Sequence, residues 1–129
     1  MPFDEECNLI AHYESPYHRG RLPDPTIFHE LRNPTCGDWI RLELRFERTR
    51  WVELAYFEGG GCVLSQSAAS MLCEYIEGHT IGELLNFTSD EMVTLIGINI
   101  SPGRLHCALL AFRALKLILC LQNGSDTSG

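Results

Sequence analysis

The stretch Trp39–Phe57 reads WIRLELRFERTRWVELAYF, and it decides how the rest of the chain can be arranged. From Ile40 to Phe46, apolar residues alternate with charged ones, which is the period of a half-buried strand. The segment from Trp51 onward alternates in a similar way, with Val52, Leu54 and Tyr56 expected on one face and Trp51, Glu53, Ala55 and Phe57 on the other. Because the link between the two segments is short and polar, we predict an antiparallel hairpin.

The elements around the hairpin follow from turn residues, capping signals and periodicity. Proline and glycine in residues 15–25 predict a loop or extended arm, and residues 26–31 predict a short edge strand. After Gly59–Gly61 the apolar period changes to 3.6, which predicts helices. The remaining predicted elements are a short helix in residues 5–13, a helix at Leu64–Glu77 closed by Gly78, two short helices with capping boxes at Thr80–Glu83 and Thr88–Glu91, and a long last helix from Ser101-Pro102 to about Gln122.

These elements define one α+β domain. Three strands followed by four helices predict a small three-stranded antiparallel sheet with helices packed on one face. Hydrophobic residues make up 45% of the 129 residues, which is enough for a core of this size. We expect a single domain at residues 1–122 and a polar, disordered tail at residues 123–129.

The net charge of the chain argues against two classes of binding partner. The formal net charge is −7 with ten Lys+Arg, so we expect no nucleic-acid partner and no anionic membrane surface. The N-terminal residues do not form a secretory signal. The most apolar run, Ala108–Leu121, is interrupted by charged residues and is too short to span a bilayer. We therefore expect a cytoplasmic protein.

Three of the six cysteines lie at the boundaries of predicted elements. Cys36 precedes the first long strand, Cys62 follows the glycines before a helix, and Cys107 lies in the opening turns of the last helix. Such positions can bring side chains together over a rigid scaffold, and nearby helix N-termini favour the thiolate form. Without a secretory signal we expect reduced thiols rather than disulfides. We expect Cys73 and Cys120 to be buried in the core.

Asp38 adds a carboxylate to this set of thiols. It stands two residues after Cys36, so on an extended segment both side chains point to the same side. Together with Cys62 and Cys107, these residues would complete a tetrahedral site for zinc or an iron–sulfur cluster. Clusters kept for electron transfer usually have four thiolate ligands. An oxygen ligand therefore predicts a cluster that is held less firmly.

Simpler interpretations stay open at this point. Each cysteine could be a small buried hydrophobic residue, His106 a surface or helix-capping residue, and the triple glycine a flexible turn. For His12, His18 and His29 the sequence reveals no partner. The chain has no P-loop, no dinucleotide-binding fingerprint and no G-x-S-x-G motif.

Several separated motifs occur in one order along the chain. They are His12-Tyr13 with Pro16, Gly20, Leu22 and Asp24; Asn33–Asp38; Phe57–Cys62 with Ser65, Ser67, Ala68, Ser70 and Met71; and Arg104–Ala108. This combination resembles the NifU N-terminal/IscU/SufU family of iron–sulfur cluster assembly scaffolds and covers nearly the whole chain. The resemblance implies an α+β protein that receives sulfur from a cysteine desulfurase. It also implies a [2Fe–2S] cluster or zinc bound through Cys36, Asp38, Cys62 and Cys107.

The chain combines features of two branches of that family. Asn33–Asp38 and Arg104 are similar to SufU, but the segment Asp90–Ser101 lacks the insertion that SufU proteins carry before the last cysteine. His106 is similar to the histidine of IscU. The chaperone-binding motif of IscU is degraded to Ile100–Arg104, which argues against recognition by the dedicated Hsp70-type chaperone.

Three functions are compatible with these residues, and the sequence does not decide whether the protein is an enzyme. The first is a scaffold that takes sulfur from the desulfurase, with Cys62 and Cys107 as candidate sulfur acceptors, and passes a labile [2Fe–2S] cluster to apo iron–sulfur proteins. In that scaffold His106 would be an alternate ligand or would form a hydrogen bond with the site, and Arg104 would offset the charge of the site. The second is a zinc-dependent sulfurtransferase that uses the same residues. The third is a purely structural zinc domain.

Overall fold

A computed structural model describes residues 9–128, apart from residues 16, 26, 35–36 and 49, and describes side chains as far as Leu121. The sheet has three antiparallel strands in the order β1 (Ile27–Arg32), β2 (Trp39–Glu47) and β3 (Trp51–Gly60). Residues 9–14 are helical, and the later helices are α2 (Val63–Ile76), α3 (Ile81–Leu85), α4 (Ser89–Ile96), a 3₁₀ turn η1 (Pro102–Arg104), α5 (Leu105–Ala108) and α6 (Leu110–Ser128). The predicted α+β fold is therefore confirmed.

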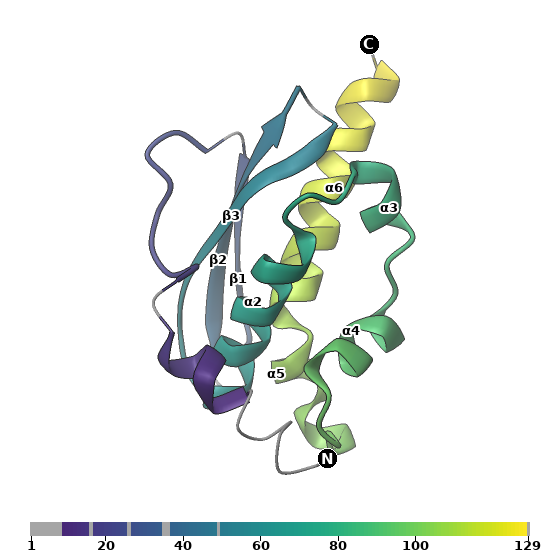
Figure 1. Ribbon diagram of the computed structural model, residues 1–129. Coiled ribbons are helices and arrows are strands. Elements are labelled where there is room, and N and C mark those ends of the chain that lie inside the picture. The colour runs from purple at the N-terminus through teal and green to yellow at the C-terminus, as the bar shows by residue number, and fades with distance from the viewer. Residues whose placement is uncertain (1–8, 16, 26, 35–36, 49, 129) are drawn as a thin grey trace.

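The two longest helices cover one face of the sheet. Figure 1 shows α2 and α6 side by side along that face, with α2 against β3 and α6 against β1 and β2. Ile40, Leu42 and Leu44 of β2 point into this layer and are fully buried. Each such side chain contributes roughly 1.5–3 kcal/mol when it leaves water, so the alternation seen in the sequence fixes the inner face of the sheet.

A β-bulge changes the predicted faces of β3. The register pairs Arg45 with Leu54 and Phe46 with Val52, which leaves Glu53 as an extra residue. The extra residue reverses the alternation, so Val52 shares the buried face with Ala55 and Phe57. The prediction that Val52 lies on the same face as Leu54 and Tyr56 was therefore wrong.

The predicted arm lies along the free edge of β3 and is held there by hydrogen bonds. The Phe57 N–H donates to the His18 carbonyl at 2.8 Å, and the Gly20 N–H donates to the Phe57 carbonyl at 2.8 Å. Farther along, the Leu22 N–H donates to the carboxylate of Glu43 at 2.7 Å, and that carboxylate also accepts a bond from Arg41. The arm therefore occupies backbone groups that an open edge strand would expose.

The helix ends agree with the capping signals, with one exception. Thr80 with Glu83, and Thr88 with Glu91, form the two predicted capping boxes. The predicted single last helix is instead divided, because Leu109 leaves helical geometry between α5 and α6 with φ −102° and ψ 5°. Beyond Gln122 the chain contains no proline to stop the helix, and α6 continues to Ser128.

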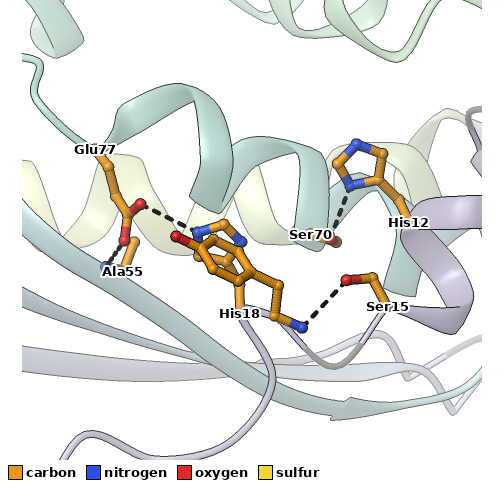
Figure 2. Close-up of polar contacts among 7 residues, drawn as sticks. His12, Ser15, His18, Ala55, Ser70 and Glu77 are labelled. Carbon is orange, nitrogen blue, oxygen red and sulfur yellow. Dashed lines mark hydrogen bonds and ion pairs between the residues drawn. The ribbon is translucent and has the colours of Figure 1, made fainter.

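Two of the histidines have partners on or near α2, which the sequence did not reveal. His18 is buried, and its Nε2 lies 3.1 Å from Glu77 Oε1, while the Ala55 N–H donates to the other oxygen of Glu77 at 3.0 Å. His12 Nδ1 lies 2.9 Å from Ser70 Oγ. Figure 2 shows both rings turned toward α2. These contacts attach the N-terminal segments to the helix layer.

Within the described part of the chain, no helix combines the length and apolar character needed to cross a membrane.

Candidate metal centre

Three elements meet at one end of the sheet and carry the candidate ligands. Asp38 immediately precedes β2, Cys62 is the residue on which α2 begins, and Cys107 lies within α5. Because α5 packs against α2, Cys107 is brought beside the start of α2. The side chains therefore converge from parts of the chain that are far apart in sequence.

The donor atoms of these three residues form one compact group. One ligand atom each from Asp38, Cys62 and Cys107 lies within 4.8 Å of the other two. Cys62 Sγ lies 3.3 Å from Asp38 Oδ2, and the Cys62 backbone N–H donates to Asp38 Oδ1 at 3.2 Å. Donors on one tetrahedral ion lie roughly 3.3–3.8 Å apart, so small movements would let these three share an ion.

The burial of the three residues is unequal. Asp38 and Cys107 are each 2% exposed, whereas Cys62 is half-buried. A molecule approaching from solvent therefore meets Cys62 before it meets the other two.

The glycines before Cys62 allow this close approach. Gly61 has φ +125°, and a Cβ at this position would overlap the carboxylate of Asp38. At Gly60 a Cβ would lie 2.7 Å from the indole nitrogen of Trp39. At Gly59 a Cβ would lie 2.6 Å from the backbone carbonyl oxygen of Trp39. The triple glycine is thus required for packing around the site, rather than being only a flexible turn.

The site holds a carboxylate beside two cysteine side chains. Burial acts to raise the pKa of Asp38, but hydrogen bonds from Cys107, Cys62 and Ser65 outweigh it and leave the pKa below its usual value. Burial, the hydrogen bond to Asp38 and the nearby Cys62 raise the pKa of Cys107 to about 12. Near neutral pH Cys107 is therefore a protonated thiol, and a metal ion would have to displace its proton.

Arg104 supplies positive charge at the solvent side of the site. Hydrogen bonding and charge attraction from Cys62, and then from Cys107, raise the pKa of its exposed guanidinium group. A guanidinium can only donate hydrogen bonds, so Arg104 brings a donor and a positive charge to the solvent side of the site.

Ser65 and Gln66 extend the site inward, and neither was predicted to have a role there. The Ser65 hydroxyl donates to the Cys62 carbonyl at 3.1 Å, and its oxygen lies 3.7 Å from Cys62 Sγ. Gln66 Nε2 donates to Ser65 Oγ at 3.1 Å, and both residues are buried. The sequence signal that could have indicated these contacts is that Ser65 stands three residues after Cys62, the N-cap residue of α2.

The remaining cysteines and His106 do not belong to the compact donor group that the structure describes. Cys36 lies outside the described residues. His106 is half-buried on α5 and does not belong to the compact donor group, so its role as an alternate ligand stays a prediction. Cys73 is buried in the core, as predicted, and burial and Glu77 raise its pKa well above the usual value. Cys120 is exposed on α6, so the prediction that it is a core residue was wrong: it falls on the solvent side of the helix.

The donor set suits a thiophilic metal. Two thiols and one carboxylate are ligands that zinc and iron–sulfur centres accept, whereas magnesium and calcium prefer oxygen alone. The described residues supply three donors, which leaves one position of a tetrahedral ion for a further ligand.

Known proteins resemble this chain in sequence and in fold. The model of the NifU-like N terminal domain matches residues 4–120. The chain is 33% identical to the zinc-dependent sulfurtransferase SufU of Bacillus subtilis, over 92% of this chain and 90% of the relative. It is 36% identical to the iron–sulfur cluster assembly scaffold protein IscU of Thermotoga maritima, over 84% of this chain and 87% of the relative.

A solved structure shows the same fold at lower identity. The putative iron–sulfur cluster assembly scaffold protein for the SUF system from Fervidobacterium islandicum superposes with a TM-score of 0.76 at 21% identity, covering 87% of this chain and 93% of that one. The family match over residues 4–120 shows that the chain belongs to the family of NifU-like N-terminal domains.

Proposed function

We propose that this protein is a scaffold for iron–sulfur cluster assembly. It accepts sulfur from a cysteine desulfurase, holds a labile [2Fe–2S] cluster, and passes that cluster to apo iron–sulfur proteins. The observation that carries the proposal is the compact group of Asp38, Cys62 and Cys107, with Cys62 facing solvent. Cys36, predicted from the sequence, would be the fourth ligand.

The unequal burial suggests which cysteine meets the sulfur donor. The half-buried Cys62 is accessible, whereas Cys107 is 2% exposed. In the transfer step, the Cys62 thiolate attacks the outer sulfur of the desulfurase persulfide. A new sulfur–sulfur bond forms on Cys62 while the bond to the desulfurase cysteine breaks, and that cysteine leaves as a thiolate, so no net oxidation occurs. Arg104 brings a positive charge to this side of the site.

The carboxylate of Asp38 would keep the cluster exchangeable. Iron in these clusters prefers sulfur and nitrogen ligands to oxygen, so the Asp38 corner is the weakest one. Asp38 already accepts two hydrogen bonds from Cys62 in the metal-free protein. It can therefore return to these partners when the cluster leaves.

A zinc-dependent sulfurtransferase is the second candidate. It is favoured by the SufU relative and by the electrostatic attraction between Arg104 and the two cysteines of the site. Zinc would then occupy the same donors, and one thiolate would accept the persulfide sulfur.

Anaerobic reconstitution with iron and sulfide separates the two functions. The scaffold should develop the visible charge-transfer absorption of a [2Fe–2S] cluster and transfer it to an apo-ferredoxin. A protein that takes up only zinc and forms no chromophore would support the sulfurtransferase instead.

A further inference from the structure

A hydrogen-bonded pair lies directly beneath Cys62, which is more exposed than Cys107. Ser65 is fully buried, and its hydroxyl oxygen lies 3.1 Å from the Cys62 carbonyl oxygen and 3.7 Å from Cys62 Sγ. Gln66, 2% exposed, donates to the same hydroxyl oxygen at 3.1 Å. We propose that Ser65 is a positioning residue that donates a hydrogen bond to the metal-bound sulfur of Cys62, and that Gln66 orients it. This inference rests on the proposed metal-binding role of the site.

The number of available hydrogens supports this assignment. In the metal-free protein the Cys62 thiol can donate to Asp38 Oδ2 at 3.3 Å. When a metal binds, the thiol loses its hydrogen and the sulfur becomes an acceptor. The side-chain amide of Gln66 occupies a lone pair of Ser65 Oγ, so the single Ser65 hydrogen stays available for Cys62.

The hydroxyl can turn without leaving a buried group unsatisfied. The Cys62 carbonyl, which accepts from Ser65 in the metal-free protein, also accepts from the Gln66 backbone N–H at 3.3 Å. This second bond remains when the Ser65 hydrogen moves from the carbonyl oxygen to the sulfur. The rotation therefore avoids the cost of an unpaired carbonyl oxygen.

A hydrogen bond of this kind has two measurable effects. Groups that hold a ligand in place typically change metal affinity by about 10–100-fold when they are removed. A donor also withdraws electron density from the sulfur, and hydrogen bonds to cluster sulfurs help to set the reduction potential. Loss of the donor should therefore weaken binding and make the bound cluster harder to reduce.

The test compares Ser65→Ala with Ser67→Ala. Ser67 is an equally buried serine on the same helix, but its hydroxyl donates to the Leu9 carbonyl at 2.9 Å instead of to the site. We expect Ser65→Ala to bind zinc about 10–100-fold more weakly than wild type, measured by competition with a chelating dye. With Co²⁺ as the probe, its sulfur-to-metal charge-transfer band should move to lower energy. The reconstituted [2Fe–2S] cluster should show a more negative reduction potential, and Ser67→Ala should change none of the three.

A second variant keeps the test decisive if Ser65→Ala folds poorly. Gln66→Met removes the side-chain donor at similar size, and we expect shifts in the same direction but smaller. Wild-type zinc affinity, band position and potential in a folded Ser65→Ala protein would overturn the inference, as would equal shifts in Ser67→Ala. If wild type itself binds no zinc, cobalt or cluster, then the proposed function fails, which is a different outcome.

Discussion

Gly61→Ala tests whether the shape of the glycine loop creates the metal centre. The substitution has two costs, because Gly61 has φ +125° and because its new methyl group would overlap the carboxylate of Asp38. A side chain held in this backbone region costs about 1–3 kcal/mol. Displacing Asp38 also removes its bonds to the Cys62 backbone N–H and sulfur, and an unsatisfied buried donor costs about 1–3 kcal/mol. We therefore expect the free energy of unfolding to fall by roughly 2–6 kcal/mol.

Gly78→Ala separates backbone strain from displacement of Asp38. Gly78 follows α2 with φ +89°, and a Cβ there meets nothing within 4 Å. This control should lose only the strain energy, about 1–3 kcal/mol, and should keep wild-type zinc affinity.

The assay combines urea unfolding, followed by tryptophan fluorescence, with zinc competition on the same samples. We expect Gly61→Ala to be less stable than Gly78→Ala and to lose at least 10-fold in zinc affinity, in line with the loss of a positioned ligand. If folded Gly61→Ala bound zinc as tightly as wild type, or if both variants lost affinity equally, then the shape of the glycine loop would not create the metal centre.

Four further predictions concern ligands, protons and helix packing. Cys62→Ser should sharply reduce zinc binding, whereas Cys73→Ser should leave it intact because Cys73 is buried in the core away from the donor group; equal losses of metal, measured by elemental analysis, would contradict the assignment. Zinc binding should release a proton from Cys107, whose pKa is about 12, so affinity should rise with pH across the neutral range; calorimetry that shows no proton release in buffers of different ionisation enthalpy would exclude this. Asp38→Ala should lengthen the half-life of a reconstituted cluster and slow its transfer to an apo-ferredoxin, but should weaken zinc binding; a shorter half-life would overturn our account of the carboxylate. Lys116→Met should lower the free energy of unfolding by about 1–3 kcal/mol, because the Lys116 ammonium donates at 3.0 and 2.9 Å to carbonyl groups at the end of α3; unchanged stability in chemical denaturation would show that these bonds are unimportant.

The parts of this molecule that local patterns determine were predictable from the sequence. The alternation of apolar and charged residues predicted β2 and its buried face. The threonine–glutamate pairs predicted where α3 and α4 begin. Each of these signals lies within a few residues and depends on period or on one hydrogen bond. The family motifs added the expectation that Asp38, Cys62 and Cys107 meet.

The features that the sequence did not reveal are of two kinds. Some depend on contacts between distant residues, and others depend on which face of a strand or helix a residue occupies. The bulge at Glu53 reverses one half of β3, and no glycine or proline marks it. The partners of His12 and His18 lie 58 and 59 residues away, so no local pattern indicates them. Cys120 lies in an apolar helix, but its angular position faces it toward solvent. The contact of Ser65 with Cys62 is local, yet only the packing of the helix start shows that it reaches the sulfur.

We propose that Asp38, Cys62 and Cys107 hold a labile iron–sulfur cluster. The most direct measurement is the iron, acid-labile sulfide and zinc content of the anaerobically purified and reconstituted protein, with its visible absorption. Our account predicts iron and sulfide in equal amounts, a [2Fe–2S] chromophore, and loss of that chromophore when apo-ferredoxin is added. Stoichiometric zinc that iron and sulfide do not replace, with no chromophore, would contradict it.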